Sequence, residues 1–335
     1  MDHPLTDNQV AEQWGVTFQP IDTPEVRLRV AIAGTGPLII LVHGFPECWY
    51  SWRHQIQPLV RAGYQVALPD VRGYGGSDAP AQVEDYSMQA LTNDMAAISR
   101  TLSPNDKSII VGHDWGAPIA WNSALLFDTT FLAVAGFSVP HVPPAETDAI
   151  ELFRRLFTDK GLFHYMVYFQ SPGIAEAELE TDVARSIRLF YTALAGDSSV
   201  NAWPTNKTVD QTLLDDIPEP QLPRPWLSQE DINYYTLQFK RSGFSGPLNR
   251  YRNFKRDSYF LRAANKTTLQ QPSLFIHGDK DMVNHMYPAG PRAAMTPYVS
   301  GKHQSITLTD CGHWTQQEQA DQTNQLLLTW LDSLS

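Results

Sequence analysis

The stretch Ser108-Ile-Ile-Val-Gly-His-Asp-Trp-Gly-Ala-Pro118 decides the fold of this chain. An apolar strand is predicted to end at Gly112 and a helical pattern begins near Gly116, so Asp114 lies at the turn between them. A strand-to-helix turn this tight has no room for large side chains, which explains the flanking glycines. Pro118 fits only the first turn of a helix. The pattern is that of a nucleophile elbow with a carboxylate as the nucleophile.

An aspartate at such a turn indicates a reaction at saturated carbon. Alkylation of serine would give an ether that water does not readily cleave, whereas alkylation of a carboxylate gives an ester that a base-activated water can hydrolyse. Aspartate is already ionised at neutral pH. We therefore expect an epoxide or an alkyl halide as the electrophile. A plain helix N-cap is the alternative interpretation of Asp114 when it is taken alone. The chain contains no G-x-S-x-G, and Ser77 is interpreted as part of a glycine-rich loop.

Around the elbow, the first 140 residues alternate strand-like and helix-like segments. The predicted strands are 27–33, 37–42, 65–69, 108–112 and 131–137, and the predicted helices are 49–62, 88–102 and 117–127. Several of the strands are apolar throughout, which is typical of strands buried on both faces of a mostly parallel sheet. The alternation predicts an α/β fold with helices flanking a central sheet.

The sequence pattern changes between residues 143 and 270, where aromatic residues are frequent and helical patterns replace strand patterns. Strand patterns return at 273–277 and 305–308, and an amphipathic helix is predicted over 319–331. We therefore predict an α/β core made of residues 1–142 and 271–335. Residues 143–270 are predicted to form an inserted, mainly helical lid.

Composition excludes several other classes of protein. Of 335 residues, 42% are hydrophobic and 18% are charged, so a sizeable core is expected and disorder is not. The net charge of −11 argues against a nucleic-acid partner. Two cysteines cannot form a disulfide scaffold. Neither a targeting signal nor an apolar run long enough to span a bilayer is apparent, so we expect a cytoplasmic protein without membrane insertion. Zinc and dinucleotide motifs are missing, so we expect no metal and no cofactor.

A candidate base and its acidic partner follow the last two strand patterns. His313 lies in Asp310-Cys-Gly-His-Trp314, and a largely neutral imidazole can accept a proton at neutral pH. Asp281 ends the stretch His277-Gly-Asp-Lys-Asp281, and an acid at a strand end can orient a histidine. Asp279 competes with it, because turn chemistry explains either residue equally well.

A candidate oxyanion hole follows the strand at 37–42. A sharp turn at His43-Gly-Phe-Pro46 would aim the Phe45 N–H into the site beside the N–H of Trp115. Two such donors would stabilise negative charge on the Asp114 carbonyl oxygen during ester hydrolysis. An ordinary Gly-Pro turn is the alternative interpretation.

In these motifs the chain resembles the epoxide hydrolases of the α/β-hydrolase superfamily, in particular the hydrolase domain of the soluble epoxide hydrolases. The resemblance extends from about Gly15 to Leu334. The stretches that carry it are 43–47, 70–77, 112–116, 310–315, 168–180 and 246–253. The last two lie in the predicted lid and are more specific than the core motifs, which dehalogenases share.

The resemblance implies that two lid tyrosines, Tyr165 and Tyr251, donate hydrogen bonds to the epoxide oxygen. A phenol has a pKa of about 10, so it is protonated at neutral pH and can supply a proton to a leaving alkoxide. Tyr168 is a close rival to Tyr165, and packing of all three rings is the alternative. Arg250 departs from the pattern, because mammalian relatives carry an aromatic residue before the second tyrosine.

The implied function is hydrolysis of an epoxide to a vicinal diol through an ester on Asp114, with water activated by His313 and Asp281. The implied partners are a small-molecule epoxide and water, with no cofactor. A haloalkane dehalogenase is the alternative, because those enzymes share the tryptophan after the nucleophile. A non-catalytic ligand receptor of the same fold is the third possibility.

Overall fold

The computed structural model describes residues 5–197, 204 and 206–334. In this described part, eight strands form one sheet in the order β1-β2-β4-β3-β5-β6-β7-β8. The strands are β1 (Thr17–Asp22), β2 (Arg27–Ala33), β3 (Leu38–Val42), β4 (Gln65–Pro69), β5 (Ser108–His113), β6 (Phe131–Phe137), β7 (Ser273–Gly278) and β8 (His303–Leu308). The β1–β2 and β2–β4 pairs are antiparallel and the others are parallel. The predicted mostly parallel α/β fold is confirmed.

The strand missing from the sequence prediction is β1. Of its six residues only Ile21 is buried. Pro20 has no backbone N–H, so it cannot donate a hydrogen bond to a neighbouring strand. A strand with one buried side chain lacks the apolar pattern of the central strands, and proline is tolerated only at the edge of a sheet. β1 lies at the edge and pairs with β2 alone.

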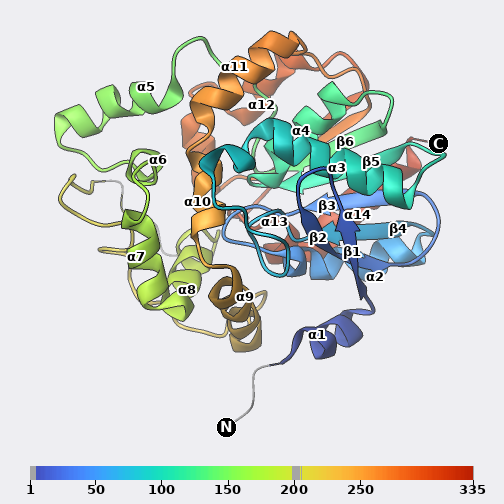
Figure 1. Cartoon of the computed structure of the whole chain (residues 1–335), viewed down its shortest axis with the longest axis horizontal. Helices are drawn as coiled ribbons and strands as arrows, with labels where there is room; N and C mark the ends of the chain where they lie inside the picture. Colours follow the sequence, from blue (N-terminus) through green and yellow to red (C-terminus); the bar gives the residue numbers. More distant parts are fainter. Residues whose placement is uncertain (1–4, 198–203, 205, 335) are drawn as a thin grey trace.

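The central strands are apolar because helices cover both of their faces. Every residue of β3 is at most 1% exposed. On one side, α4 (Gly116–Leu126) contacts β3, β5 and β6 and packs against α3 (Met88–Leu102). On the other side lies α2 (Arg53–Arg61), which contacts β4 and the C-terminal helix α14 (Ala320–Asp332). Figure 1 shows α4 above the strands and α2 below them.

Between β6 and β7 the regular elements of the described residues are helices, joined by loops and by two isolated β-bridges within the stretch. The helices are α5 (Ala149–Leu156), η3 (Thr158–Lys160), α6 (Tyr165–Tyr168), α7 (Ile174–Thr181), α8 (Val183–Ala193), α9 (Gln229–Ser242), α10 (Ser245–Tyr251) and α11 (Phe254–Ala264). Helices α5 to α9 are grouped on one side of the molecule, on the left in Figure 1. After this stretch β7 pairs in parallel with β6. The division into core and lid remains a prediction.

The remaining short elements complete the connections around the sheet. They are α1 (Asp7–Trp14), η1 (Trp49–Trp52), η2 (Val83–Tyr86), η4 (Met282–Met286), α12 (Pro291–Met295), η5 (Thr296–Tyr298) and α13 (Thr315–Glu318). Because β3, β5, β7 and β8 run in the same direction, their carboxyl ends meet at one edge of the sheet. Ligands of open α/β sheets bind at this edge. The loops that leave it carry the candidate site.

Candidate active site

The turn between β5 and α4 holds Asp114 in an unusual backbone conformation, with φ at 50°. A non-glycine residue in the left-handed region persists where the surroundings enforce it, often at functional sites. The surroundings here are backbone: a Cβ on Gly112 would lie 1.9 Å from the Gly116 carbonyl oxygen, and one on Gly116 would lie 2.1 Å from that of Val42. The predicted elbow is therefore present, and its glycines are required by close backbone approach.

The Asp114 carboxylate lies between a backbone donor and an imidazole. Its Oδ1 accepts a hydrogen bond from the Phe45 N–H at 2.7 Å, and its Oδ2 lies 3.4 Å from His313 Nε2. Burial alone would raise the pKa of Asp114, but His313 and the Phe45 N–H outweigh it and hold the pKa below its usual value. The carboxylate is thus ionised and available as a nucleophile at neutral pH.

The structure brings His313 together with Asp281 and not with Asp279. His313 Nδ1 lies 3.0 Å from Asp281 Oδ2 and 3.1 Å from Oδ1, and both side chains are almost fully buried. Asp279 Oδ1 instead accepts a hydrogen bond from the Cys311 N–H, which is turn chemistry. Burial favours the neutral imidazole, but the charges of Asp281 and Asp114 outweigh it and raise the pKa of His313 well above its usual value.

The two predicted oxyanion donors differ in their present partners. The Phe45 N–H is directed at Asp114, and a Cβ on Gly44 would lie 2.4 Å from Asp114 Oδ1, so glycine is needed for this approach. Among the described residues none accepts a hydrogen bond from the Trp115 N–H. This donor at the start of α4 is therefore free to meet an incoming oxygen.

A cavity of about 290 Å³ opens at Asp114 and has both predicted tyrosines in its wall. The rings of Tyr165 and Tyr251 lie edge to face with centroids 6.3 Å apart. Burial and the nearby charge of Asp114 raise the pKa of each phenol, so both remain protonated at neutral pH. Much of the remaining wall is apolar, including Met88, Trp121, Val139, Val142, Met166, Phe254, Leu261, Val283 and Met286.

Tyr168, the rival to Tyr165, and Arg250, which differs from the family pattern, each have a partner of their own. The Tyr168 hydroxyl donates to Glu178 Oε2 at 2.8 Å, and Tyr168 is not among the residues that line the cavity. Arg250 lies in the cavity wall with its guanidinium 4.7 Å from the centre of the Trp115 ring, and its charge is paired with Asp257. Arg250 thus supports the tryptophan without bringing a free cation to the site.

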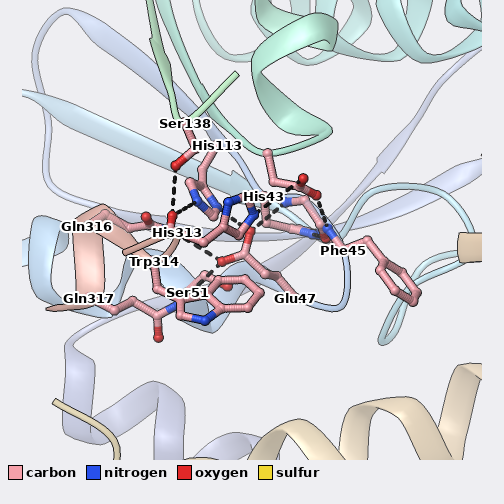
Figure 2. Close-up of polar contacts among 12 residues, drawn as sticks. His43, Phe45, Glu47, Ser51, His113, Ser138, His313, Trp314, Gln316 and Gln317 are labelled. Atoms are coloured by element: carbon pink, nitrogen blue, oxygen red, sulfur yellow. Dashed lines mark hydrogen bonds and ion pairs between the residues drawn. The ribbon is translucent and has the colours of Figure 1, made fainter. Parts of the chain in front are cut away.

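A buried polar group beside His313, made of Glu47 and His113, was not predicted from the sequence (Figure 2). Glu47 Oε2 accepts from the Gly44 N–H at 2.7 Å and contacts His113 Nδ1 at 2.8 Å. His113 Nε2 in turn donates to the His313 carbonyl oxygen at 2.7 Å. Burial would raise the pKa of Glu47, yet His113 and the Gly44 N–H lower it below its usual value, so this carboxylate is ionised.

A signal for this group was present in the sequence. Glu47 follows the turn at 43–46, and His113 ends the apolar strand pattern at 108–112. Ionisable side chains at such apolar positions are expected to be buried, and a buried charge needs a partner. Pairing two such residues that are 66 positions apart requires the tertiary structure. Ser138, after β6, adds a second hydrogen bond to the His313 carbonyl oxygen at 2.7 Å.

Two further observations concern the described residues as a whole. In residues 5–197, 204 and 206–334, no three His, Cys, Asp or Glu side chains are grouped so that they could hold a metal ion. None of the helices in that same part of the chain has the length and apolar character needed to cross a membrane.

Comparison with known proteins identifies the family. Residues 37–320 match the model of the alpha/beta hydrolase fold. Epoxide hydrolase A of Mycobacterium tuberculosis is 41% identical over 322 residues, which cover 95% of this chain and 98% of that protein. Bifunctional epoxide hydrolase 2 of Rattus norvegicus is 36% identical over 98% of this chain but only 56% of its own length.

Solved structures point the same way. An epoxide hydrolase from an endophytic Streptomyces superimposes with a TM-score of 0.90 at 42% identity, covering 96% of both chains. Epoxide hydrolase A from Mycobacterium thermoresistibile superimposes with a TM-score of 0.88 at 40% identity, covering 95% of this chain and 98% of that one.

The electrostatics of the site predict an imidazolium at His313 in the unreacted protein. Replacing Asp281 by Asn removes the charge that contributes most to stabilising the imidazolium. The pKa of His313 should then fall toward its ordinary value. Nuclear magnetic resonance of the ring nitrogens across a pH titration measures this value. Asp114→Asn should lower it as well, and a His313 that titrates at its ordinary pKa in the wild-type protein would contradict the assignment.

Proposed function

Because this chain belongs to the epoxide hydrolases of the α/β-hydrolase family, we propose that it converts epoxides to vicinal diols through a covalent ester on Asp114. The observation that carries the mechanism is the arrangement around one carboxylate. The Asp114 carboxylate contacts His313, and it lines the same cavity as the phenols of Tyr165 and Tyr251.

In the first step, an Asp114 oxygen attacks one epoxide carbon and the bond from that carbon to the ring oxygen breaks. The lowered pKa of Asp114 makes the nucleophile available without a separate base. The departing oxygen takes a proton from one of the two phenols while the other donates a hydrogen bond to it. The raised pKa values of Tyr165 and Tyr251 support this role, since an ionised phenol could not donate.

Once the ester has formed, the protonated His313 gives up its proton, which passes through water to restore the ionised phenol. In the second step, the neutral His313 takes a proton from water, and the resulting hydroxide attacks the carbonyl carbon of the Asp114 ester. Esterification removes the negative charge of Asp114, which is one of the two charges that favour the imidazolium. His313 therefore becomes a base after the first step, while Asp281 remains to orient it and to stabilise its charged form. The N–H groups of Phe45 and Trp115 stabilise the developing oxyanion, and collapse releases the diol and the carboxylate.

The helical stretch at 143–270 acts in this proposal as a lid on a core formed by residues 1–142 and 271–335. It contributes Tyr165 from α6 and Tyr251 from α10 to the cavity wall. The ring of Phe45 on the core contacts aromatic rings of this stretch, namely Phe169, Phe190, Phe244 and Tyr251. The apolar wall of the cavity favours epoxides with an apolar substituent.

An assay against two panels of substrates tests the function. We expect diol release from small, aryl and fatty epoxides. Halide release from a matched panel of alkyl halides should be absent, because phenols that protonate an alkoxide offer no advantage to a halide ion. Halide release would favour the dehalogenase, which the tryptophan at position 115 leaves open, and turnover of neither panel would favour a ligand receptor.

The two-step scheme predicts that His313→Gln accumulates the ester. Ring opening needs the Asp114 carboxylate and the phenols, whereas ester hydrolysis needs the base. Mass spectrometry of the variant after incubation with an epoxide should show a stable adduct on the peptide that contains Asp114. Asp114→Ala serves as the control and should be neither active nor modified. An unmodified His313→Gln protein would count against a covalent intermediate.

Replacement of both Tyr165 and Tyr251 by Phe should slow ring opening by at least about 100-fold, because an alkoxide must then leave without a proton donor. Rapid-quench measurement of ester formation gives this rate. Tyr168→Phe is the matched control, since its hydroxyl is bonded to Glu178, and it should leave the rate near that of the wild-type protein. A normal rate in the double variant would reject both phenols as the acid.

A further inference from the structure

The side-chain amide of Gln170 joins the two segments that carry the phenols. Its Nε2 donates to the Met166 carbonyl oxygen at 2.8 Å and to the Tyr251 carbonyl oxygen at 2.9 Å. Met166 directly follows Tyr165, and Tyr251 is itself the second phenol. One amide group therefore connects the backbones on which both phenols stand, across 81 positions of the sequence.

These segments cannot set their own relative position. The α6 helix has four residues and α10 has seven. Helices this short are not stable alone, and their last carbonyl groups have no partner within the helix. The Gln170 amide supplies a donor to one carbonyl of each helix. A directional bond at the backbone of each tyrosine restrains the distance between them more tightly than packing alone.

Neighbouring contacts hold Gln170 and the ring between the tyrosines in place. Arg252 Nε donates to the Phe169 carbonyl oxygen at 2.8 Å, and its Nη1 is paired with Glu176 at 2.8 Å. The Phe169 ring packs edge-on against Tyr165 and Tyr251, with centroids 5.8 and 4.9 Å away. Those ring contacts tolerate small displacements, whereas a hydrogen bond weakens with distance and angle.

We propose that Gln170 is a positioning residue for ring opening, acting by fixing the separation of the Tyr165 and Tyr251 hydroxyls. The inference rests on the proposed function, in which both phenols bind one epoxide oxygen. A single oxygen can accept from both only when each hydroxyl lies within about 3 Å of it. Displacement of a reacting group by about 1 Å can cost roughly 100-fold in rate.

The proposal concerns one step of the reaction. Ester hydrolysis uses His313, Asp281 and the backbone donors, and none of these contacts Gln170 in the hydrogen bonds of the described residues. Loss of the Gln170 amide should therefore slow ester formation and leave ester hydrolysis nearly unchanged. A residue with a purely structural role would not separate the two rates.

The experiment compares Gln170→Met with the matched control Gln271→Met. Methionine keeps the length and removes the donor in each case. The Gln271 amide likewise donates to the backbone, though to one carbonyl only, that of Ala124 at 2.7 Å, and Gln271 does not line the cavity. Rapid quench and mass spectrometry of the Asp114 peptide, with styrene oxide as substrate, give the rates of ester formation and ester breakdown.

For Gln170→Met we expect ester formation to be roughly 10- to 100-fold slower, with breakdown changed by less than about twofold and Gln271→Met like the wild-type protein. In a Tyr251→Phe background the effect of Gln170→Met should shrink, because the two residues act through one interaction. Equal slowing of both steps, undiminished slowing in the Tyr251→Phe background, or unchanged formation would each overturn the positioning role.

Two safeguards keep the test decisive. Gln170→Glu also lacks the amide donor at neutral pH and retains the shape, so it replaces Gln170→Met if the methionine variant does not fold. The wild-type protein and Tyr165→Phe are measured alongside. If the wild-type protein forms no ester, the proposed function fails. If it forms the ester, and Tyr165→Phe slows this step while Gln170→Met does not, only the positioning inference fails.

Discussion

The alignment of one imidazole between two carboxylates is the interaction on which the rest of the site depends. His313 lies between Asp281 and Asp114, and both charges raise its pKa despite its burial. In the proposed reaction Asp281 keeps its charge, whereas Asp114 loses its own on esterification. When that carboxylate becomes an ester, the same ring changes from a counter-ion into a base, so no further group has to be brought in for the second step.

The core and the helical region hold their reactive groups by different means. The carbonyl oxygen of His313 accepts hydrogen bonds from Ser138 and His113, which hold the backbone in place, and His113 is paired with the fully buried Glu47. A buried charge costs desolvation unless its partners compensate. Here the Gly44 N–H and the amides of Gln316 and Gln317 complete the set. The phenols depend instead on short helices joined by side chains.

The sequence predicted the turn at the end of β5 correctly. The elbow at Asp114 was predictable because small residues and a proline surround it at fixed offsets. Turn chemistry alone could not separate Asp281 from Asp279, which lie two positions apart on either side of Lys280. The choice depends on which carboxylate the loop after β7 turns toward His313. β1 was missed because an edge strand with one buried residue has too weak a pattern.

The sequence by itself determined the kind of fold and the position of the candidate nucleophile, because apolar strand patterns and the steric limits of a tight turn act between residues that are close in the chain. Only the tertiary structure decided which distant polar groups meet. Glu47 with His113, Asp281 with His313, and Gln170 with Tyr251 are pairs separated by 66, 32 and 81 positions. Hydrogen bonds act over about 3 Å, so such pairs exist only once packing of the sheet and helices has brought their backbones together.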